Sequence, residues 1–323
     1  MTIHDVARHA GVSVATVSRV LNGTTVRPEH AEAVRLAVEE LSYLPNRSAR
    51  SLRRQLSEVI GLIVPDIENP FFTTLARGVE DLTWQAGHSL VLCNTDDDPA
   101  KERSYLKIAA SENMAGVIVA PASESLDVVP LLGRGMSVVV VDRAVDAEAV
   151  DQVVVDNEAA ARTATQALID QGYERIACVT GPRATVTARL RAQSWRETME
   201  AAGLPCSDDL LKFANFRVDG GQEAMRSLCA ARPDAVLATN NLVGVGVLKE
   251  LEAAGDGIGL AVLGALPFAT TVRRDVLVVP LGAKEMGETA ARFLLERIAR
   301  TVTGPGRLHV QPVPAVRRLG DLV

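Results

Sequence analysis

A repeated alternation of short apolar runs with segments of helical length constrains the fold of this chain most strongly, from residue 58 onward. Continuous apolar runs separated by helices are typical of parallel strands covered by helices on both faces. The runs form two series, 59–64, 90–94, 116–120, 138–142 and 152–156, followed by 176–180, 234–239, 260–265 and 276–280. Helices are expected over 71–86 and 99–112. The two series predict an α/β core of two lobes, each with a doubly wound parallel sheet, and a cleft between the lobes.

Polar residues follow these runs where the strands are expected to end. They are Asp66, Asn69, 94–98, Asp142, Thr180 and Asn240. In open parallel sheets, ligands bind outside the carboxyl ends of the strands. The pattern therefore indicates a small-molecule site in the cleft, although ordinary solvated turns have the same composition.

The first 57 residues differ in charge from the rest of the chain. The whole chain of 323 residues has a net charge of −6. Residues 1–57 contain eight arginines, no lysine and five acidic residues, a net charge of +3, which leaves −9 on the remainder. A basic end on an acidic body favours a nucleic-acid contact at that end.

Three short helices are predicted in this basic segment. Thr2 and Asp5 have a spacing like that of a capping box, which begins the first helix. Gly11 ends that helix, and Ser13 is placed to cap a second helix that starts at the next residue. Pro28, in a first-turn position, opens the third helix. Two short helices joined by a tight turn, with a third that closes the core, have the plan of a helix-turn-helix domain.

The second helix is predicted to have one apolar face and one face of small residues. The inward positions of the second and third helices are Val17, Val20, Leu21, Val34, Val38 and Leu41. The outward positions are Val14, Ala15, Ser18, Arg19 and Asn22. Small outward side chains let a helix lie deep in the major groove, where Arg19 reaches guanine or phosphate. A helical subdomain that binds nothing is the alternative, which the basic charge disfavours.

Residues 2–53 resemble the DNA-binding headpiece of the LacI/GalR family of bacterial transcription regulators, through the segments TIHDVARHAGVSVATVSRVLNG and LSYLPNRSARSLR. The resemblance implies that Val14 and Ala15 read the operator. The implied DNA-binding residues of the headpiece are Thr2, Ser13, Val14, Ala15, Thr16, Ser18, Arg19 and Asn22. One departure is the turn NGTTVRPEHA, which looks one residue short and has Ala31 where an arginine is common.

The stretch NRSARSLRR, residues 46–54, has the composition of a polar linker with one large apolar residue, Leu52. The resemblance implies instead a hinge that becomes helical on the operator. Asn46, Arg47, Ala49 and Arg50 then lie near the backbone and minor groove, and Leu52 is a wedge between base pairs that bends the duplex.

Residues 58 to about 320 resemble the effector-binding core of the same family, which has the fold of periplasmic sugar-binding proteins. The segments that carry this resemblance are IGLIVPDIENPFF, LVLCNTDDDP, VVVDNEAAARTA and ARLRAQSW. The resemblance implies ligand contacts from Asn69, Phe72, Asp142, Arg191, Phe216 and Asn240. Three positions depart from the family pattern. Leu266 and Leu281 replace polar residues of the site, and Asn241 replaces a frequent aspartate.

These departures bear on the effector. A ligand hydroxyl left unpaired against a leucine costs roughly 1–3 kcal/mol. We therefore expect an effector other than a standard hexose in the usual pose, either sugar-like or, because of Arg191, anionic. Loss of effector binding, or its replacement by a protein or a phosphorylated corepressor, is the alternative.

The sequence lends little support to catalysis, metal binding or cofactor binding. It contains no G-x-S-x-G, G-x-x-x-x-G-K-[ST] or H-E-x-x-H motif, and its five histidines and four cysteines are dispersed. A doubly wound oxidoreductase and a free solute-binding protein remain as alternatives from other classes. Without a signal peptide or an apolar run of membrane length, we expect a cytoplasmic protein that does not contact the membrane.

The predicted organisation has three parts. Residues 1–45 form the helix-turn-helix domain, 46–57 the hinge and 58–323 the core. One lobe takes about 58–157 and 281–309, and the other about 158–280 and 310–323. No heptad helix follows VRRLGDLV, so we expect a homodimeric repressor on a pseudo-palindromic operator, for which the family implies a central C-G step.

Overall fold

The computed structural model describes residues 1–21, 24–43, 57–255, 257–266 and 275–322. The chain divides into two compact units, Met1–Ser57 and Glu58–Val323. No helix of the described residues is long and apolar enough to cross a membrane.

The first unit is a bundle of three helices, α1 (Ile3–His9), α2 (Val14–Leu21) and α3 (Pro28–Glu40). Its core contains Val6, Ala7, Val17, Val34, Ala37 and Tyr43. The predicted capping box is present, since the Asp5 carboxylate accepts hydrogen bonds from Thr2 N at 2.8 Å and Thr2 Oγ1 at 2.9 Å. The chain leaves α1 through Gly11, whose φ of +63° explains the glycine.

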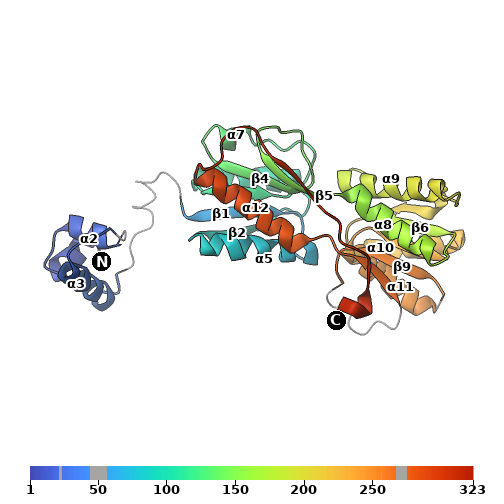
Figure 1. Cartoon of the computed structure of the whole chain (residues 1–323), viewed down its shortest axis with the longest axis horizontal. Coiled ribbons are helices and arrows are strands. Elements are labelled where there is room, and N and C mark those ends of the chain that lie inside the picture. Colours follow the sequence, from blue (N-terminus) through green and yellow to red (C-terminus); the bar gives the residue numbers. More distant parts are fainter. Residues whose placement is uncertain (22–23, 44–56, 256, 267–274, 323) are drawn as a thin grey trace. The chain divides into compact units, whose positions relative to one another are not determined.

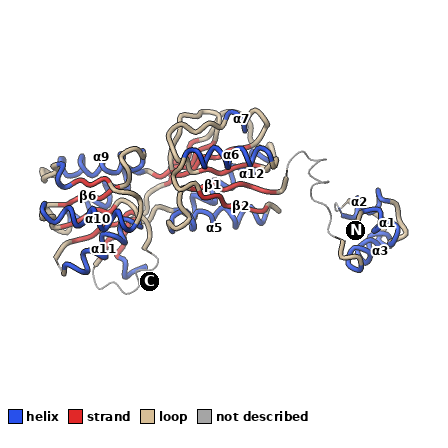
Figure 2. Tube along the Cα trace, turned by 180° about the vertical axis from the view of Figure 1, so that it is seen from behind, coloured by secondary structure: helices blue, strands red, loops and turns tan. Residues whose placement is uncertain are grey.

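The second unit contains two sheets in separate lobes (Figure 1). The first sheet has the strand order β11-β5-β4-β3-β1-β2, and all of its neighbouring strands are parallel. Its strands are β1 (Val59–Val64), β2 (Ser89–Asn94), β3 (Gly116–Val119), β4 (Ser137–Asp142), β5 (Asp151–Val155) and β11 (Leu308–Gln311). Helices α5 (Pro70–Gln85) and α12 (Ala283–Ile298) cover one face, and α6 (Pro99–Ser111) and α7 (Val129–Leu132) cover the other (Figure 2).

The second sheet has the strand order β12-β10-β9-β8-β6-β7, in which only β12 is antiparallel to its neighbour. Its strands are β6 (Ile176–Thr180), β7 (Leu211–Phe213), β8 (Ala235–Ala238), β9 (Gly259–Leu263), β10 (Val276–Val279) and β12 (Arg317–Arg318). Helices α8 (Asn157–Asp170) and α9 (Val186–Ala201) cover one face, while α10 (Val218–Leu228) and α11 (Asn241–Ala254) cover the other. Short 3-10 turns lie at Asp208–Leu210, Cys229–Ala231 and Leu319–Leu322.

The observed architecture confirms the predicted fold class of a helical headpiece and a two-lobed α/β core. The chain passes between the lobes after β5, after β10 and after β11. The last of these crossings follows Gln311, whereas the predicted lobe boundary lies after residue 309. The carboxyl ends of the strands of both sheets consequently face the segments that join the lobes.

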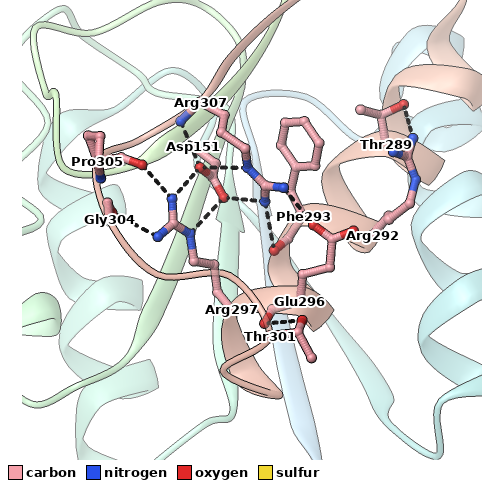
Figure 3. Close-up of polar contacts among 10 residues, drawn as sticks. All are labelled: Asp151, Thr289, Arg292, Phe293, Glu296, Arg297, Thr301, Gly304, Pro305 and Arg307. Carbon is pink, nitrogen blue, oxygen red and sulfur yellow. Dashed lines mark hydrogen bonds and ion pairs between the residues drawn. The ribbon is translucent and has the colours of Figure 1, made fainter.

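A buried ionic cluster fixes the far end of the first lobe (Figure 3). Asp151, at the start of β5, is fully buried. Its carboxylate accepts hydrogen bonds from Arg297 (Nε at 3.0 Å and Nη2 at 2.8 Å) and from Arg307 (main-chain N at 2.8 Å and Nη2 at 2.7 Å). The Arg307 guanidinium also lies 3.7 Å from the centre of the Phe293 ring. The cluster thus ties β5, the end of α12 and the entry to β11 together.

Candidate nucleic-acid interface and ligand cavity

Helix α2 begins at a side-chain cap, as predicted. The Ser13 hydroxyl accepts a hydrogen bond from Thr16 N at 3.1 Å and lies 2.9 Å from the Thr16 hydroxyl. Capping of this kind satisfies main-chain donors of the first turn and is worth about 1 kcal/mol. The start of α2 is therefore fixed locally, and Ser13 and Thr16 contribute to that cap whatever else they contact.

The outward face of α2 differs in one respect from the prediction. Ala15 and Arg19 are exposed, and Ser18 is half-buried on the same side of the helix. Val14, which we expected to point outward, is half-buried and packs against the headpiece core. This position lies in the first turn of α2, where a valine still reaches the core cluster. The accessible surface of α2 is thus dominated by Ala15 and Arg19.

Several predicted DNA-binding residues lie outside the described residues. They are Asn22, Asn46, Arg47, Ala49, Arg50 and Leu52. Thr2 is described and exposed, and its main-chain N and hydroxyl both bond to Asp5. These bonds hold the pKa of the Asp5 carboxyl below its usual range, with the main-chain bond as the largest cause.

A cavity of about 230 Å³ lies between the lobes of the second unit, at the carboxyl ends of strands from both sheets. Seven of the eight predicted ligand-binding residues line it, namely Asn69, Phe72, Asp142, Arg191, Phe216, Asn240 and Leu281. The structure therefore brings together residues up to 212 positions apart in the sequence, from Asn69 to Leu281.

Leu266 is the predicted residue that does not line the cavity. Its side chain is 5% exposed and belongs to the hydrophobic core. The chain turns at Gly264, whose φ is +95°, directly after β9. Because of this turn, it is Leu263 and Gly264 rather than Leu266 that reach the cavity wall. In this structure Leu266 therefore lies in the core beside the cavity and not in its wall.

Asp142 ends β4 and is buried in the cavity wall. Within the described residues its one ion pair is with Arg143, whose Nε lies 3.7 Å from Asp142 Oδ2. Burial raises the pKa of this carboxyl, although the neighbouring Arg143 and Arg191 guanidinium groups oppose that shift. Asp142 is thus a buried acceptor whose oxygens retain capacity for a ligand.

Arg191 faces this carboxylate from the second lobe and is held by two hydrogen bonds. Its Nε donates to Asn157 Oδ1 at 2.8 Å, and its Nη1 donates to Thr239 O at 2.7 Å. Burial lowers the pKa of the Arg191 guanidinium to about 10, although Asp142 raises it in part. Arg191 therefore remains charged at neutral pH and is oriented before any ligand arrives.

Three asparagines at helix starts present amide groups to the cavity. Asn69 and Asn240 cap α5 and α11 through their Oδ1 atoms, which accept from Phe71 N at 2.9 Å and Val243 N at 3.0 Å. Asn241 Nδ2 is buried and has no hydrogen-bond partner among the described residues. An unpaired buried donor of this kind is energetically costly.

The cavity residues that were not predicted include four polar ones, Arg143, Thr187, Asn215 and Arg217. Arg143 is buried, and its Nη1 donates to Asp97 Oδ1 at 2.5 Å and to Pro121 O at 2.8 Å. Asp96 and Asp97 have φ values of +55° and +56°, a conformation that is uncommon outside glycine. The arginine directly after the strand end at Asp142 was the available signal for this part of the site.

The cavity is equipped for binding rather than for reaction. It combines one buried carboxylate, fixed guanidinium groups and amides with the aromatic rings of Phe72 and Phe216. Within the described residues, no group of histidine, cysteine, aspartate and glutamate is arranged to hold a metal ion. Such a lining orients a small polar molecule between two lobes.

Two family models match the chain. The model described as bacterial regulatory proteins, lacI family, matches residues 2–46. The model described as periplasmic binding proteins and sugar binding domain of LacI family matches residues 57–318.

Characterised proteins are similar to the chain along nearly its whole length. A ribose operon repressor of Halalkalibacterium halodurans is 35% identical over 323 residues, covering 98% of this chain and 96% of the relative. The HTH-type transcriptional repressor PurR of Photobacterium profundum is 31% identical over 306 residues, covering 92% of each chain.

Solved structures are similar over the same length. A complex of the transcriptional regulator CelR with cellobiose has a TM-score of 0.73 at 30% identity and covers 99% of both chains. The lac repressor dimer bound to operator and the anti-inducer ONPF has a TM-score of 0.84 at 21% identity and covers 100% of this chain and 99% of the repressor, a likeness of fold.

Proposed function

The chain belongs to the LacI family of bacterial regulatory proteins, and we propose that it represses transcription by binding an operator through α2, under the control of a small effector bound between the lobes of its core. The family and the named relatives are transcriptional regulators and not enzymes, so the chain is a DNA-binding regulator. In this proposal, α2 supplies the contact with DNA and the interlobe cavity supplies the control.

The observation that carries the proposal is the construction of α2. A side-chain cap fixes its start, Val17 anchors it in the headpiece core, and Ala15 and Arg19 are exposed on its surface. A helix with a small residue and an arginine on its free face fits the major groove. The net charge of +3 on residues 1–57 supports approach to the phosphate backbone.

We propose that the chain acts as a homodimer, as the lac repressor does in its complex with operator. Strand β2 is an edge strand, and its Val91 and Leu92 are 41% and 44% exposed. Trp84, on the neighbouring α5, is 72% exposed. An edge strand with exposed apolar side chains needs a cover, and a second copy that supplies one also supplies a second headpiece. Two headpieces related by a two-fold axis recognise a pseudo-palindromic operator.

The hinge residues Asn46, Arg47, Ala49, Arg50 and Leu52 complete the proposed contact. In this proposal they form a helix on the operator, and Leu52 inserts between base pairs. An effector controls DNA binding only if it binds the DNA-competent and DNA-incompetent arrangements with different affinity. If the separation of the lobes differs between the two arrangements, the shape of a cavity lined by both lobes differs as well. The affinity for the effector then differs between the two arrangements.

The relatives' names support a sugar or another small polar molecule as the effector, since they include ribose operon repressors, a PurR repressor and a cellobiose complex. The buried Asp142 carboxylate and the oriented Arg191 guanidinium in the cavity lining favour a working effector site over a lost one. They also favour a small molecule in the cavity over a protein corepressor on the surface.

Replacement of Arg19 tests the DNA-binding proposal. We expect Arg19→Ala to weaken binding of a selected operator duplex by on the order of 1–3 kcal/mol and to relax sequence preference. Titration of labelled operator and of random duplex measures both effects. Arg35→Ala is the matched control, because Arg35 is an exposed arginine of α3 that pairs with Glu32. Equal losses on operator and random DNA would make Arg19 a phosphate contact, and no loss on either would contradict the assignment of α2.

A further inference from the structure

We propose that the ligand of the interlobe cavity is a neutral deoxy sugar of monosaccharide size, whose deoxygenated carbon lies against Leu281. The proposal rests on the proposed function, in which this cavity is the effector site. It goes further by giving the chemical class of the effector.

The size of the cavity sets the first limit. Its volume is about 230 Å³, below the range of roughly 300–1,000 Å³ that is common for pockets of drug-sized ligands. Phe72 and Phe216 belong to its lining, and aromatic rings offer a flat apolar surface to the C–H face of a ring. A space of this size suits a single sugar ring.

One part of the wall requires groups that both donate and accept hydrogen bonds. The Asp142 carboxylate only accepts, and the Arg191 guanidinium only donates. Asn241 Nδ2 and Arg143 Nε are buried donors without a hydrogen-bond partner in the described residues. Adjacent hydroxyls of a polyol can donate to the Asp142 carboxylate and accept from a guanidinium group of the same wall.

On the second sheet the wall has one apolar side chain with exposed surface, that of Leu281, because Leu263 is fully buried in the core. Asn240 and Asn241 follow β8, Leu263 ends the next strand, β9, and Leu281 lies just beyond β10. The last two positions are neighbours, because Val279 of β10 pairs with Leu263, and Gly264 N donates to Val279 O at 2.9 Å.

A hydroxyl buried against this apolar wall has no side-chain partner there. A ligand that carries this hydroxyl binds more weakly, by roughly one to two orders of magnitude, than the same ligand without it. A methyl or methylene group at the same position contacts the Leu281 side chain and avoids that loss.

The charges of the lining disfavour an anion. Four carboxylates, those of Asp66, Asp96, Asp97 and Asp142, oppose three guanidinium groups, those of Arg143, Arg191 and Arg217. Asp97 already pairs with Arg143, and Arg191 is turned toward Asn157 and Thr239 by hydrogen bonds. Arg217 Nη2 lies 3.9 Å from Asp96 Oδ1. Each of these guanidinium groups is therefore already engaged, and a phosphate or carboxylate of the ligand would have to compete for it.

Calorimetric titration of the full-length chain with matched sugars tests the proposal. The probes are D-ribose with 2-deoxy- and 5-deoxy-D-ribose, D-galactose with 6-deoxy-D-galactose, and ribose 5-phosphate as the anion. We expect one deoxy sugar to bind at least about tenfold more tightly than its parent and than the phosphate. Leu281→Gln, which supplies a hydrogen-bonding partner, should remove or reverse that preference, whereas the apolar Leu281→Met should keep its sign.

Three results overturn the proposal. They are equal or tighter binding of the parent in every pair, tighter binding of ribose 5-phosphate, and no binding of any probe. Operator affinity, measured on the same preparations without sugar, separates these results from failure of the proposed function. An operator that still binds tightly leaves the regulator intact and removes only the deoxy-sugar assignment.

Discussion

Asp142 combines a buried carboxylate with a left-handed backbone conformation, since its φ is +66°. Burial raises the pKa of this carboxyl against the opposing effect of two arginines, so the charged form is unfavourable in the ligand-free protein. A residue of this kind contributes to binding at the expense of stability. Substitution of Asp142 is therefore expected to change ligand binding and stability in opposite directions.

We expect Asp142→Asn to increase the free energy of unfolding of the ligand-free protein by about 1 kcal/mol at neutral pH. Asparagine carries no charge and tolerates a positive φ. The pKa of Asp142 in the folded state lies above its unfolded value of about 3.9. The wild type therefore becomes more stable as the pH falls from the folded-state pKa to the unfolded-state pKa. The stability advantage of Asp142→Asn over the wild type shrinks over the same pH range. Thermal unfolding at neutral pH and near pH 4 measures the difference. A variant less stable than the wild type at neutral pH contradicts this prediction.

At the scale of secondary-structure elements, Asp151 shows the opposite behaviour. Burial alone would raise the pKa of its carboxyl, but hydrogen bonds from Arg297 and Arg307 outweigh burial and hold the pKa well below its usual range. The bonds join β5, α12 and the segment before β11, which are distant in sequence. Removing the Asp151 charge deprives Arg297 of this buried carboxylate and leaves Arg307 with its ion pair to Glu296.

We expect Asp151→Asn to lower the free energy of unfolding by about 3 kcal/mol at neutral pH. The folded-state pKa of Asp151 is depressed, so its contribution is fully present above the unfolded value of about 3.9 and is lost as the pH falls below it. The two proteins should therefore converge in strong acid. Denaturant unfolding across this pH range measures the effect, with the exposed Asp146→Asn as control. Equal losses in Asp151→Asn and Asp146→Asn would mean that the cluster has no special role.

The predicted strands are those with a continuous apolar run, which include the exposed edge strand β2 as well as the buried strands. Each predicted strand, from 59–64 to 276–280, begins and ends within two residues of an observed strand. Strands β7, β11 and β12 were not predicted. They lie at sheet edges and are partly or fully exposed, so they lack the continuous apolar run on which the prediction depended.

At the scale of the whole molecule, the cavity follows from the rule that parallel strands collect their carboxyl ends at one edge. This rule and the family resemblance were enough to predict that residues from both lobes share one site. Local backbone turns explain the two differences. The left-handed conformation at Asp142 directs the next residue, Arg143, into the cavity wall, and the turn at Gly264 moves Leu266 out of it. The spacing of apolar residues in the sequence does not indicate which single residues adopt a left-handed backbone conformation, so these two turns could not be predicted from it.

Selection of bound duplexes from a random-sequence DNA pool by the full-length chain tests the central claim most directly. We expect one motif to be enriched, with two inverted half-sites as required by a two-fold symmetric dimer. The selected duplex should bind at least about a thousandfold more tightly than random duplex. Failure to enrich any sequence, or enrichment of a single motif without inverted symmetry, would contradict a dimeric, sequence-specific regulator.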